Sequence, residues 1–254
     1  MNGRLRLRQP AAGYRAAIDP VFLAAAVPAR AGQRVLDLGT GVGTAALCLA
    51  ARVPGVAVVG LEIQPAYAAL AAENAAANGL ADRVRVVQGD LLRPPAGLAP
   101  GAFDHVMANP PHLPAGSGHP PPDPAKAAAN VEGEAALADW VAAALAMVRS
   151  RGTVTLVHRA DRLDAVLAAL HGRAGAIVAC PLWPGPEPAS RPAKRVIVQA
   201  RAGVATPFRL SPGLVLHGPG GAFTAAAQAI LRGGAGLDLG AALPDDGAQH
   251  RQGT

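Results

Sequence analysis

The chain has 254 residues, of which 51% are hydrophobic and 3% aromatic, so it can build a large aliphatic core within one α/β domain that carries short additions. Its net charge of +6 comes almost entirely from arginine, whose planar guanidinium binds phosphate in a two-pronged way and suits a nucleic-acid partner. The isolated Cys48 and Cys180 exclude a disulfide framework or a paired-cysteine zinc site and favour a reducing, cytoplasmic compartment. No stretch approaches the ~18 uncharged apolar residues of a membrane span.

Strand and helix patterns alternate through most of the chain. In chain order, the predicted elements are an arm or short strand at 4–8, a helix at 21–27, a strand at 34–38, a helix at 44–52, a strand at 56–62, a helix at 65–78, strands at 83–88 and 103–108, a helix at 134–149, a strand at 153–157, a helix at 162–170, strands at 177–182, 195–200 and 214–216, and a helix at 224–231. Asp19 and Pro20 lie where an N-cap and a first-turn proline would start the first helix. A loop rich in proline and glycine covers 113–124, and the polar residues after Asp245 are expected to be disordered. Strands that alternate with helices predict parallel βαβ units in a doubly wound sheet.

The unusual residues of the sequence gather where four predicted strands end. Residues 37–43 close the first of these strands, Glu62 ends the second, Asp90 follows the third and 109–112 follow the fourth. In a doubly wound sheet, ligands bind in the crevice outside the carboxyl ends of the strands. We therefore expect these residues to form one site, because ordinary turns do not require acids at three successive strand ends.

The segment 37–43, with the sequence DLGTGVG, follows a strand and opens a helix. Glycines let the backbone bend tightly and approach a ligand closely. The spacing is GxGxG, and Thr44 stands where the dinucleotide pattern GxGxxG places its third glycine, which disfavours NAD. The residues of this segment that we assign to a cofactor are Asp37, Gly39, Thr40, Gly41 and Gly43.

Two acids at the following strand ends extend this site. Glu62 can accept hydrogen bonds from both ribose hydroxyls of an adenosine, and Asp90 can accept one from an adenine amino group. Leu91 and Leu92 offer apolar contact for the ring, and Ile63 is assigned to the same cofactor site. The glycine turn carries no Lys or Arg, and the chain contains no GxxxxGK(S/T) phosphate loop. A cofactor that needs adenosine recognition without a phosphate site is S-adenosylmethionine rather than NAD or ATP.

Asn109, Pro110, Pro111 and His112 are the predicted catalytic residues. Methyl transfer to an NH2 group is difficult because the nitrogen lone pair is delocalised. The Asn109 side-chain carbonyl and the Pro110 backbone carbonyl can accept hydrogen bonds from both NH2 hydrogens and draw the nitrogen toward tetrahedral geometry. The two prolines stiffen this loop. Because a sulfonium is a good leaving group, positioning and electrostatics suffice and no metal is expected. Asn109 is also expected to contact the cofactor.

From Arg34 to Asn109, the arrangement resembles the class I S-adenosylmethionine-dependent methyltransferases. The resemblance implies a Rossmann-like sheet of seven strands, mostly parallel with an antiparallel last strand, with short N- and C-terminal additions. The loop at 109–112 is similar to the NPPY motif, which N6-adenine methyltransferases share with N5-glutamine protein methyltransferases. In those families the fourth residue is an aromatic that stacks on the plane of the acceptor. Here it is His112, whose imidazole can stack over less area.

Three further segments, at 9–21, 132–134 and 191–196, resemble the bacterial tRNA1(Val) adenine-37 N6-methyltransferase family. The resemblance implies methylation of adenine N6 in a tRNA, and an N-terminal segment that helps to close the cofactor site. An adenine in an anticodon loop is single-stranded and can be splayed into a pocket. The residues carried over for closing the cofactor site are Tyr14, Asp19 and Pro20.

Basic side chains near these segments are the candidate contacts for RNA phosphates. Each true phosphate contact should steepen the salt dependence of RNA binding. The residues assigned to RNA are Arg15, Arg191, Lys194 and Arg195. The expected division of the chain is an N-terminal segment closing the cofactor site at 1–30, a methyltransferase domain at 31–203, a C-terminal strand and helix packed on it at 204–243, and a disordered tail at 244–254.

Three alternatives stay open. A protein glutamine-N5 methyltransferase would share the Asn-Pro-Pro motif, although that family usually has an extra N-terminal helical domain, and only about 30 residues precede the strand at 34–38. A non-catalytic RNA-binding module on a methyltransferase scaffold would explain His112, but the three retained acids and Asn109 argue against decay. An NAD oxidoreductase is disfavoured by the glycine spacing.

Overall fold

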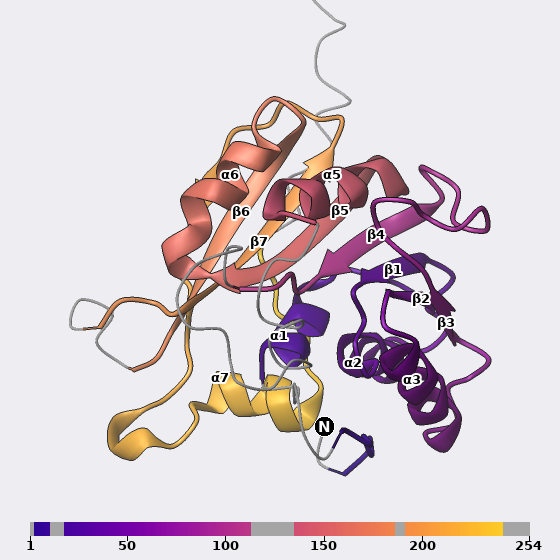
Figure 1. The fold of residues 1–254 in the computed structure, drawn as a ribbon. Helices are drawn as coiled ribbons and strands as arrows, with labels where there is room; N and C mark the ends of the chain where they lie inside the picture. Colours follow the sequence, from indigo (N-terminus) through magenta and orange to yellow (C-terminus); the bar gives the residue numbers. More distant parts are fainter. Residues whose placement is uncertain (1–2, 11–17, 113–134, 186–190, 241–254) are drawn as a thin grey trace, which may run out of the picture.

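The computed structural model describes residues 3–10, 18–112, 135–185 and 191–240 (Figure 1). The expectations for Tyr14, Arg15, the 113–124 loop and the C-terminal tail lie outside these residues. The described residues form an α/β fold in which helices cover both faces of one sheet.

Seven strands form the central sheet in the order β3-β2-β1-β4-β5-β7-β6 (Figure 1). Their bounds are β1 Arg34–Leu38, β2 Ala57–Glu62, β3 Val84–Gln88, β4 Phe103–Ala108, β5 Val148–Arg159, β6 Ala174–Trp183 and β7 Arg195–Ala202. β1 to β5 pair in parallel, and β7, the last of the seven in the chain, is antiparallel to both neighbours. The predicted sheet is therefore confirmed. Because β1 lies between β2 and β4, the order of connection reverses there, which places a ligand crevice at the carboxyl ends of β1 and β4.

Two short strands extend the sheet beyond these seven. β8 Arg209–Leu210 and β9 Leu214–Val215 both pair in parallel with β6. β9 matches the strand expected at 214–216. β8 has two residues, both exposed, and this is too short for an alternating pattern, so the sequence does not predict it.

Helices on the two faces of the sheet bury two aliphatic cores (Figure 1). The helices are α1 Asp19–Ala26, α2 Thr44–Arg52, α3 Pro65–Ala77, α5 Leu137–Met147, α6 Leu163–Leu170 and α7 Ala225–Gln228. α1 and α2 contribute side chains such as Phe22 to one core, and α5 and α6 contribute side chains such as Val141 to the other. β1 serves both, because successive strand residues point to opposite faces: Val35 lies in the first core and Leu36 in the second.

Two boundaries near the site differ from the sequence-based prediction. Asp19 is the first residue of α1 rather than its N-cap, and Ile18 takes the N-cap position without a side-chain hydrogen bond. The Asp19 carboxylate instead contacts His112 and Arg195. β5 begins at Val148 rather than at 153, because the chain passes directly from α5 into the strand. Its residues 149–151 are exposed and polar, which hides this part of the strand from a hydrophobic pattern.

The two ends of the described chain also differ in detail from the prediction. Residues 4–8 form an extended arm without strand pairing, because their backbone groups bond to side chains of α3. The helix predicted at 224–231 is the four-residue α7, followed by a five-residue π-helix, Ala229–Gly233.

Asn74 on α3 ties the N-terminal arm to the glycine turn. Its side chain is fully buried, and its Oδ1 accepts a hydrogen bond from the Arg8 N–H at 2.8 Å. Its Nδ2 donates to the carbonyl oxygens of Arg8 and Val42, both at 3.0 Å. Loss of this amide would leave three backbone groups without their partner, each costing about 1–3 kcal/mol where it stays buried. The arm and the glycine turn are therefore held by one side chain.

Candidate active site

A cavity of about 260 Å³ opens at the carboxyl ends of β1 to β4. The predicted site residues that line it are Pro20, Asp37, Gly39, Thr40, Gly41, Glu62, Ile63, Asp90, Leu91, Asn109, Pro110, Pro111 and His112. Leu92, expected to contact the ring, also lines it. Among the lining residues that the sequence analysis did not assign are Val42, Leu61, Gln64, Tyr67 and Trp140. The fold thus brings four segments, each at the end of a different strand, to one place.

Two glycines of the turn between β1 and α2 leave little room for a side chain. Gly39 has a φ of +66°, and a Cβ at this position would lie 2.4 Å from Cη2 of Trp140, so only glycine fits. Gly43 has a φ of +85° and stands at the N-cap of α2, outside the residues that line the cavity. A Cβ there would lie 3.3 Å from the Cβ of Ala71. Gly43 therefore serves the close packing of α2 on α3, and the cofactor contact expected for it stays a prediction.

Asp37, at the end of β1, is buried and accepts a hydrogen bond of 2.6 Å from the Thr40 hydroxyl. Burial raises the pKa of Asp37 to about 7, the negative charge of Glu62 adds to this effect, and the hydrogen bonds from Thr40 and Ala46 oppose it. No basic side chain in the described part of the chain forms an ion pair with it. Asp37 is therefore a carboxyl group that a bound cation would ionise.

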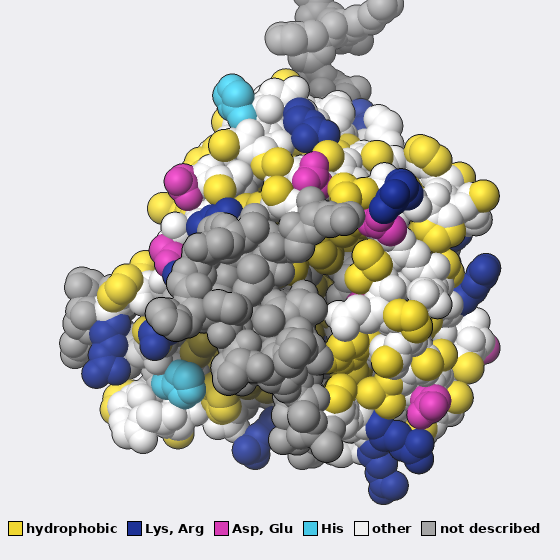
Figure 2. Space-filling view, viewed as in Figure 1, with side chains coloured by type: hydrophobic (Ala, Val, Ile, Leu, Met, Phe, Trp, Pro, Cys, Tyr) yellow, Lys and Arg dark blue, Asp and Glu magenta, His cyan; other side chains and the backbone are white. Residues whose placement is uncertain are grey.

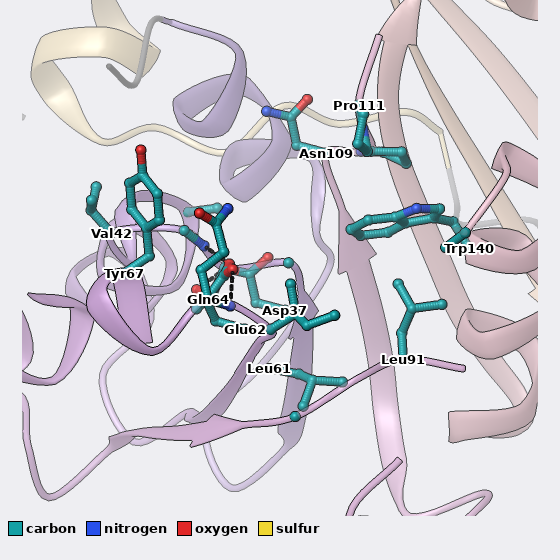
Figure 3. A pocket seen from close by; sticks show the side chains of 18 of the residues that line it. Asp37, Val42, Leu61, Glu62, Gln64, Tyr67, Leu91, Asn109, Pro111 and Trp140 are labelled. Atoms are coloured by element: carbon teal, nitrogen blue, oxygen red, sulfur yellow. Dashed lines mark hydrogen bonds between the residues drawn. The ribbon is translucent and has the colours of Figure 1, made fainter. Parts of the chain in front are cut away.

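Glu62 ends β2, and its two carboxylate oxygens are held by two different backbone groups (Figure 3). Oε2 accepts from the Gly41 N–H at 2.9 Å, and Oε1 accepts from the Gln64 N–H at 3.0 Å. Burial raises the pKa of Glu62, although hydrogen bonds from the backbone oppose the shift. A carboxylate oxygen can accept more than one hydrogen bond. Both oxygens therefore stay able to accept from a pair of ligand hydroxyls.

Asp90 organises the loop that follows β3. Its Oδ1 accepts from the Leu92 N–H at 2.9 Å, and its Oδ2 pairs with the Arg93 guanidinium at 3.2 Å. Beside it, Ile63 is 60% exposed and Leu92 is 41% exposed, although both are large apolar side chains. These exposed aliphatic groups at the cavity offer contact surface for a flat ring.

The cavity lining is acidic, and of its three carboxyl groups only that of Asp90 has a basic partner among the described residues. Its lining contains the carboxyl groups of Asp37, Glu62 and Asp90, and no Lys or Arg among the described lining residues. Two of these carboxyl groups have a raised pKa because burial opposes their ionised form. A positively charged ligand would relieve that cost, whereas a phosphate would increase it. The electrostatics therefore favour a cationic ligand.

Asn109 follows β4 directly and leaves a polar atom unsatisfied. Its Oδ1 is buried and has no hydrogen-bond partner in the described structure. A buried oxygen in this condition costs about 1–3 kcal/mol, so its presence in a cavity points to a ligand donor. Figure 3 shows Asn109 and Pro111 at the opposite end of the cavity from Leu61. Pro110, between them, is buried.

His112 is held by a network of polar side chains from three other elements. Its Nε2 lies 3.5 Å from Asp19 Oδ2, which also accepts a 2.7 Å hydrogen bond from Arg195 Nε. Burial works against ionised Asp19, but the bonds from His112 and Arg195 outweigh it and lower the pKa of Asp19. The His112 ring meets His158 edge-on, with centroids 5.4 Å apart, and His158 Nε2 lies 3.3 Å from the Pro111 carbonyl oxygen.

This network gives two of the predicted site residues further contacts. Asp19, expected to contact the cofactor, does not line the cavity itself but contacts His112, which does; its cofactor contact stays a prediction. Arg195, expected to contact RNA, donates a hydrogen bond from its Nε to Asp19, and its RNA contact stays a prediction. Arg191 and Lys194 are exposed. On the face shown in Figure 2, Lys and Arg side chains are spread around the edge rather than gathered into one patch, so the view singles out no basic surface.

Two aromatic residues at the cavity were missed by the sequence analysis. Figure 3 shows Trp140 near Leu91 on one side of the cavity and Tyr67 on the other. The indole Nε1 of Trp140 and the hydroxyl of Tyr67 are buried and have no hydrogen-bond partner in the described residues. Trp140 belongs to the apolar stripe of α5, so its helical spacing explains its burial but does not reveal that it also borders the cavity.

Parts of the chain are similar in sequence to a known protein family and to curated methyltransferases. Residues 16–118 match the family described as the methyltransferase small domain. A tRNA1(Val) (adenine(37)-N6)-methyltransferase from Porphyromonas gingivalis is 35% identical over 133 residues, which are 52% of this chain and 51% of that protein. A release factor glutamine methyltransferase from Deinococcus radiodurans is 47% identical over 81 residues, which are 32% of this chain and 27% of that protein. The chain thus spans about half, or less, of the length of these curated relatives.

Among solved structures, a predicted O-methyltransferase from Agrobacterium tumefaciens aligns with a TM-score of 0.72 at 24% identity, over 86% of this chain and 98% of that one. A geranyl diphosphate methyltransferase, solved with sinefungin, aligns with a TM-score of 0.50 at 16% identity. Both likenesses concern the fold alone. None of the helices in the described part of the chain combines the length and the apolar character that a bilayer crossing requires. Residues 16–118 are therefore similar to the methyltransferase small domain, and the chain shares the fold of the predicted O-methyltransferase from Agrobacterium tumefaciens.

Proposed function

We propose that this protein is a cytoplasmic S-adenosylmethionine-dependent N-methyltransferase that modifies N6 of an adenine in tRNA. The observation that carries the proposal is the Oδ1 of Asn109, which has no hydrogen-bond partner among the described residues and lies at the end of a cavity whose two buried carboxyl groups have no described basic side chain as partner. The relatives named tRNA1(Val) (adenine(37)-N6)-methyltransferase support the choice of acceptor.

The residues present fit S-adenosylmethionine. Glu62 would accept from the ribose hydroxyls, since both of its oxygens keep acceptor capacity. Ile63 and Leu91 would contact the adenine, with Asp90 facing its amino group. Asp37 would take the positively charged part, which would stabilise its ionised form. When bound, this cofactor supplies an activated methyl group on a positively charged sulfur.

The Asn109 loop would hold the acceptor nitrogen. Asn109 Oδ1 and the Pro110 carbonyl oxygen each accept one hydrogen bond from an NH2 group, which turns the nitrogen lone pair out of the plane of the base. Pro110 and Pro111 restrict the loop and so keep the two acceptors in place. The two carbonyl oxygens would thereby stabilise the positive charge that develops on the nitrogen during methyl transfer.

The segments outside the catalytic domain would serve closure and RNA binding. We assign 1–30 to closing the cofactor site, 31–203 to catalysis and 204–243 to an addition packed on the catalytic domain. The tie between the N-terminal arm and the glycine turn through Asn74 supports the first assignment. Among the basic residues, Arg191 and Lys194 are exposed and available for phosphates, and Arg15 is assigned to the same role.

A protein glutamine-N5 methyltransferase is the second candidate. A primary amide presents the same NH2 group to Asn109 and Pro110, and the release factor glutamine methyltransferase from Deinococcus radiodurans is 47% identical over 81 residues. The shared segment covers 32% of this chain, less than the 52% shared with the tRNA methyltransferase from Porphyromonas gingivalis. The longer match favours RNA.

Radiolabelled methyl transfer separates these candidates. The purified full chain is incubated with labelled S-adenosylmethionine and, in parallel, unmodified tRNA, total RNA and a release factor. We expect label in tRNA from the wild-type protein and none from Asn109→Ala. Label in the release factor but not in RNA would move the assignment to the glutamine reaction, and label in no acceptor would overturn the proposal.

A further inference from the structure

We propose that Asp19 and His112 form a proton-accepting pair at the methyl-transfer site, with His112 as the base and Asp19 as its positioning residue. The inference rests on the proposed N-methylation and deepens it, because it assigns a chemical role to the residue that replaces the aromatic of the NPPY motif.

Methylation of an NH2 group releases a proton that has to be taken up. Transfer breaks the bond between the methyl carbon and sulfur, whose electron pair stays on sulfur, and forms a bond between that carbon and nitrogen. The acceptor nitrogen then carries two hydrogens and a positive charge, and it must lose one proton to become the neutral methylamine. The two oxygens that hold it, on Asn109 and Pro110, are amide carbonyls and too weakly basic to keep the proton.

The contacts of His112 prepare one of its ring nitrogens for this task. Nε2 faces the Asp19 carboxylate at 3.5 Å, so it is the nitrogen that carries the hydrogen in the neutral ring. Nδ1 is then an acceptor, and it is buried without a hydrogen-bond partner in the described structure. The Arg195 guanidinium keeps Asp19 ionised, since its hydrogen bond helps to lower the pKa of Asp19. The carboxylate can therefore stabilise the imidazolium that forms at His112.

The other acidic groups that line the cavity have other contacts and are assigned to the cofactor. Asp37 accepts a hydrogen bond from Thr40, and the oxygens of Glu62 accept from backbone N–H groups. Asp90 is paired with Arg93. His112 lies directly after the Asn-Pro-Pro segment and lines the same cavity, so it is the base that we assign to the nitrogen held there.

The charged and titratable neighbours of His112 agree with this role. They are Asp19 on α1, Arg195 on β7 and His158 on β5, with Arg162 near His158. Burial and, to a smaller extent, the neighbouring His112 lower the pKa of His158 to about 4. His158 therefore stays neutral near neutral pH and does not compete for the proton. Instead, His158 contacts the Pro111 carbonyl oxygen through its Nε2 and packs edge-on against the His112 ring.

The test is the pH profile of kcat at saturating S-adenosylmethionine and saturating unmodified tRNA, between about pH 5.5 and 8.5. For the wild type, we expect kcat to fall on the acidic side, as His112 becomes protonated. His112→Phe keeps an aromatic ring but no base, so it should lose this acidic limb and about 100-fold in kcat, with cofactor affinity within about threefold. In Asp19→Asn the imidazolium is less stable, so the midpoint of the limb should move to lower pH and the plateau should drop.

The matched control is His171→Phe, which removes an exposed histidine after α6 and should behave as the wild type. If residue 112 instead stacks on the acceptor, His112→Phe should retain or raise kcat. That result, or an unchanged midpoint in Asp19→Asn, would overturn the proton-accepting pair while leaving N-methylation intact. If either variant fails to fold, the wild type still decides: a flat profile overturns the pair. Wild-type protein that labels no acceptor would instead indicate that the proposed function is wrong.

Discussion

The two ends of the cavity are built in different ways. At the end formed by β1 and β2, Glu62 is held by backbone groups of its own and the adjacent turn, and Asp37 by Thr40 three residues away. At the end formed by Asn109 and His112, which we call the acceptor end, the contacts come from segments far apart in the chain, and Asn109 Oδ1 and His112 Nδ1 are buried without a partner among the described residues. The carboxyl groups of the first end are thus held by neighbouring residues before any ligand binds. We expect the acceptor to complete the second end, so acceptor specificity should reside there.

The largest effect is expected from Asn109→Ala. If the acceptor end acts only in the transfer step, this change should reduce methyl transfer by about 1000-fold, as loss of a positioned charge-stabilising group does. Cofactor affinity, measured by calorimetry, should stay within about threefold. The control is Asn78→Ala, which removes an amide that holds Arg6 outside the cavity and should leave transfer near the wild-type rate. A large loss of cofactor affinity in Asn109→Ala would show that the two ends are not separate.

Glu62→Ala should weaken cofactor binding at the end of the cavity formed by β1 and β2. We expect S-adenosylmethionine affinity to fall about 100-fold, because hydrogen bonds to a charged group contribute about 1.5–3 kcal/mol each and the Gly41 and Gln64 N–H groups also lose their acceptor. Glu62→Gln, which keeps one acceptor oxygen, should fall between this variant and the wild type. Unchanged calorimetric affinity in Glu62→Ala would refute the ribose role.

Gly39→Ala tests the contact between the glycine turn and α5. The added Cβ would lie 2.4 Å from the Trp140 ring at a φ of +66°, so overpacking and backbone strain should lower the free energy of unfolding by about 1–3 kcal/mol. The double variant Gly39→Ala/Trp140→Leu relieves the clash but not the strain, so denaturant unfolding should show partial recovery relative to Trp140→Leu alone. No loss of stability in Gly39→Ala would contradict the close packing.

The smallest effect is the pH dependence of cofactor binding. Because the pKa of Asp37 is raised to about 7, the free protein holds this carboxyl group protonated at lower pH, and a cation binds its ionised form better. S-adenosylmethionine affinity should therefore rise about tenfold between pH 6 and 8. The same shift means that the contribution of Asp37 to the stability of the free protein is lost as pH rises toward 7. Asp37→Asn should flatten both dependences, and a wild-type affinity that is independent of pH would argue against the raised pKa.

The difference between the two ends also explains what could be predicted from the sequence. Glu62 and the turn around Asp37 lie at the ends of apolar strands, so the apolar runs and the parallel sheet are enough to bring them together. The pair of Asp19 and Arg195 joins residues 176 positions apart, and no local pattern encodes it. The sequence therefore predicts a cofactor contact for Asp19 and an RNA contact for Arg195, but not the contacts that link both residues to His112.

Trp140 and β8 were missed for related reasons. The helical spacing of Trp140 predicts burial, but which ligand or loop a buried side chain meets depends on how α5 sits on the sheet. β8 has only two residues, and its pairing with β6 depends on that neighbouring strand rather than on its own composition. Patterns within each segment thus predicted the alternating strands and helices, and the family resemblance implied a sheet of seven strands. The arrangement of the acceptor end depends on contacts between distant segments, which neither of them predicts.

The most direct test of the account is the identity of the methylated nucleoside. Unmodified tRNA is labelled by the wild-type protein, digested to nucleosides and separated by chromatography with mass detection, with Asn109→Ala in parallel. We predict that the label appears as N6-methyladenosine and is lost in the variant. Label on a ring nitrogen, on a ribose, or in equal amount from Asn109→Ala would contradict the role of the Asn109 loop as the holder of an exocyclic NH2 group.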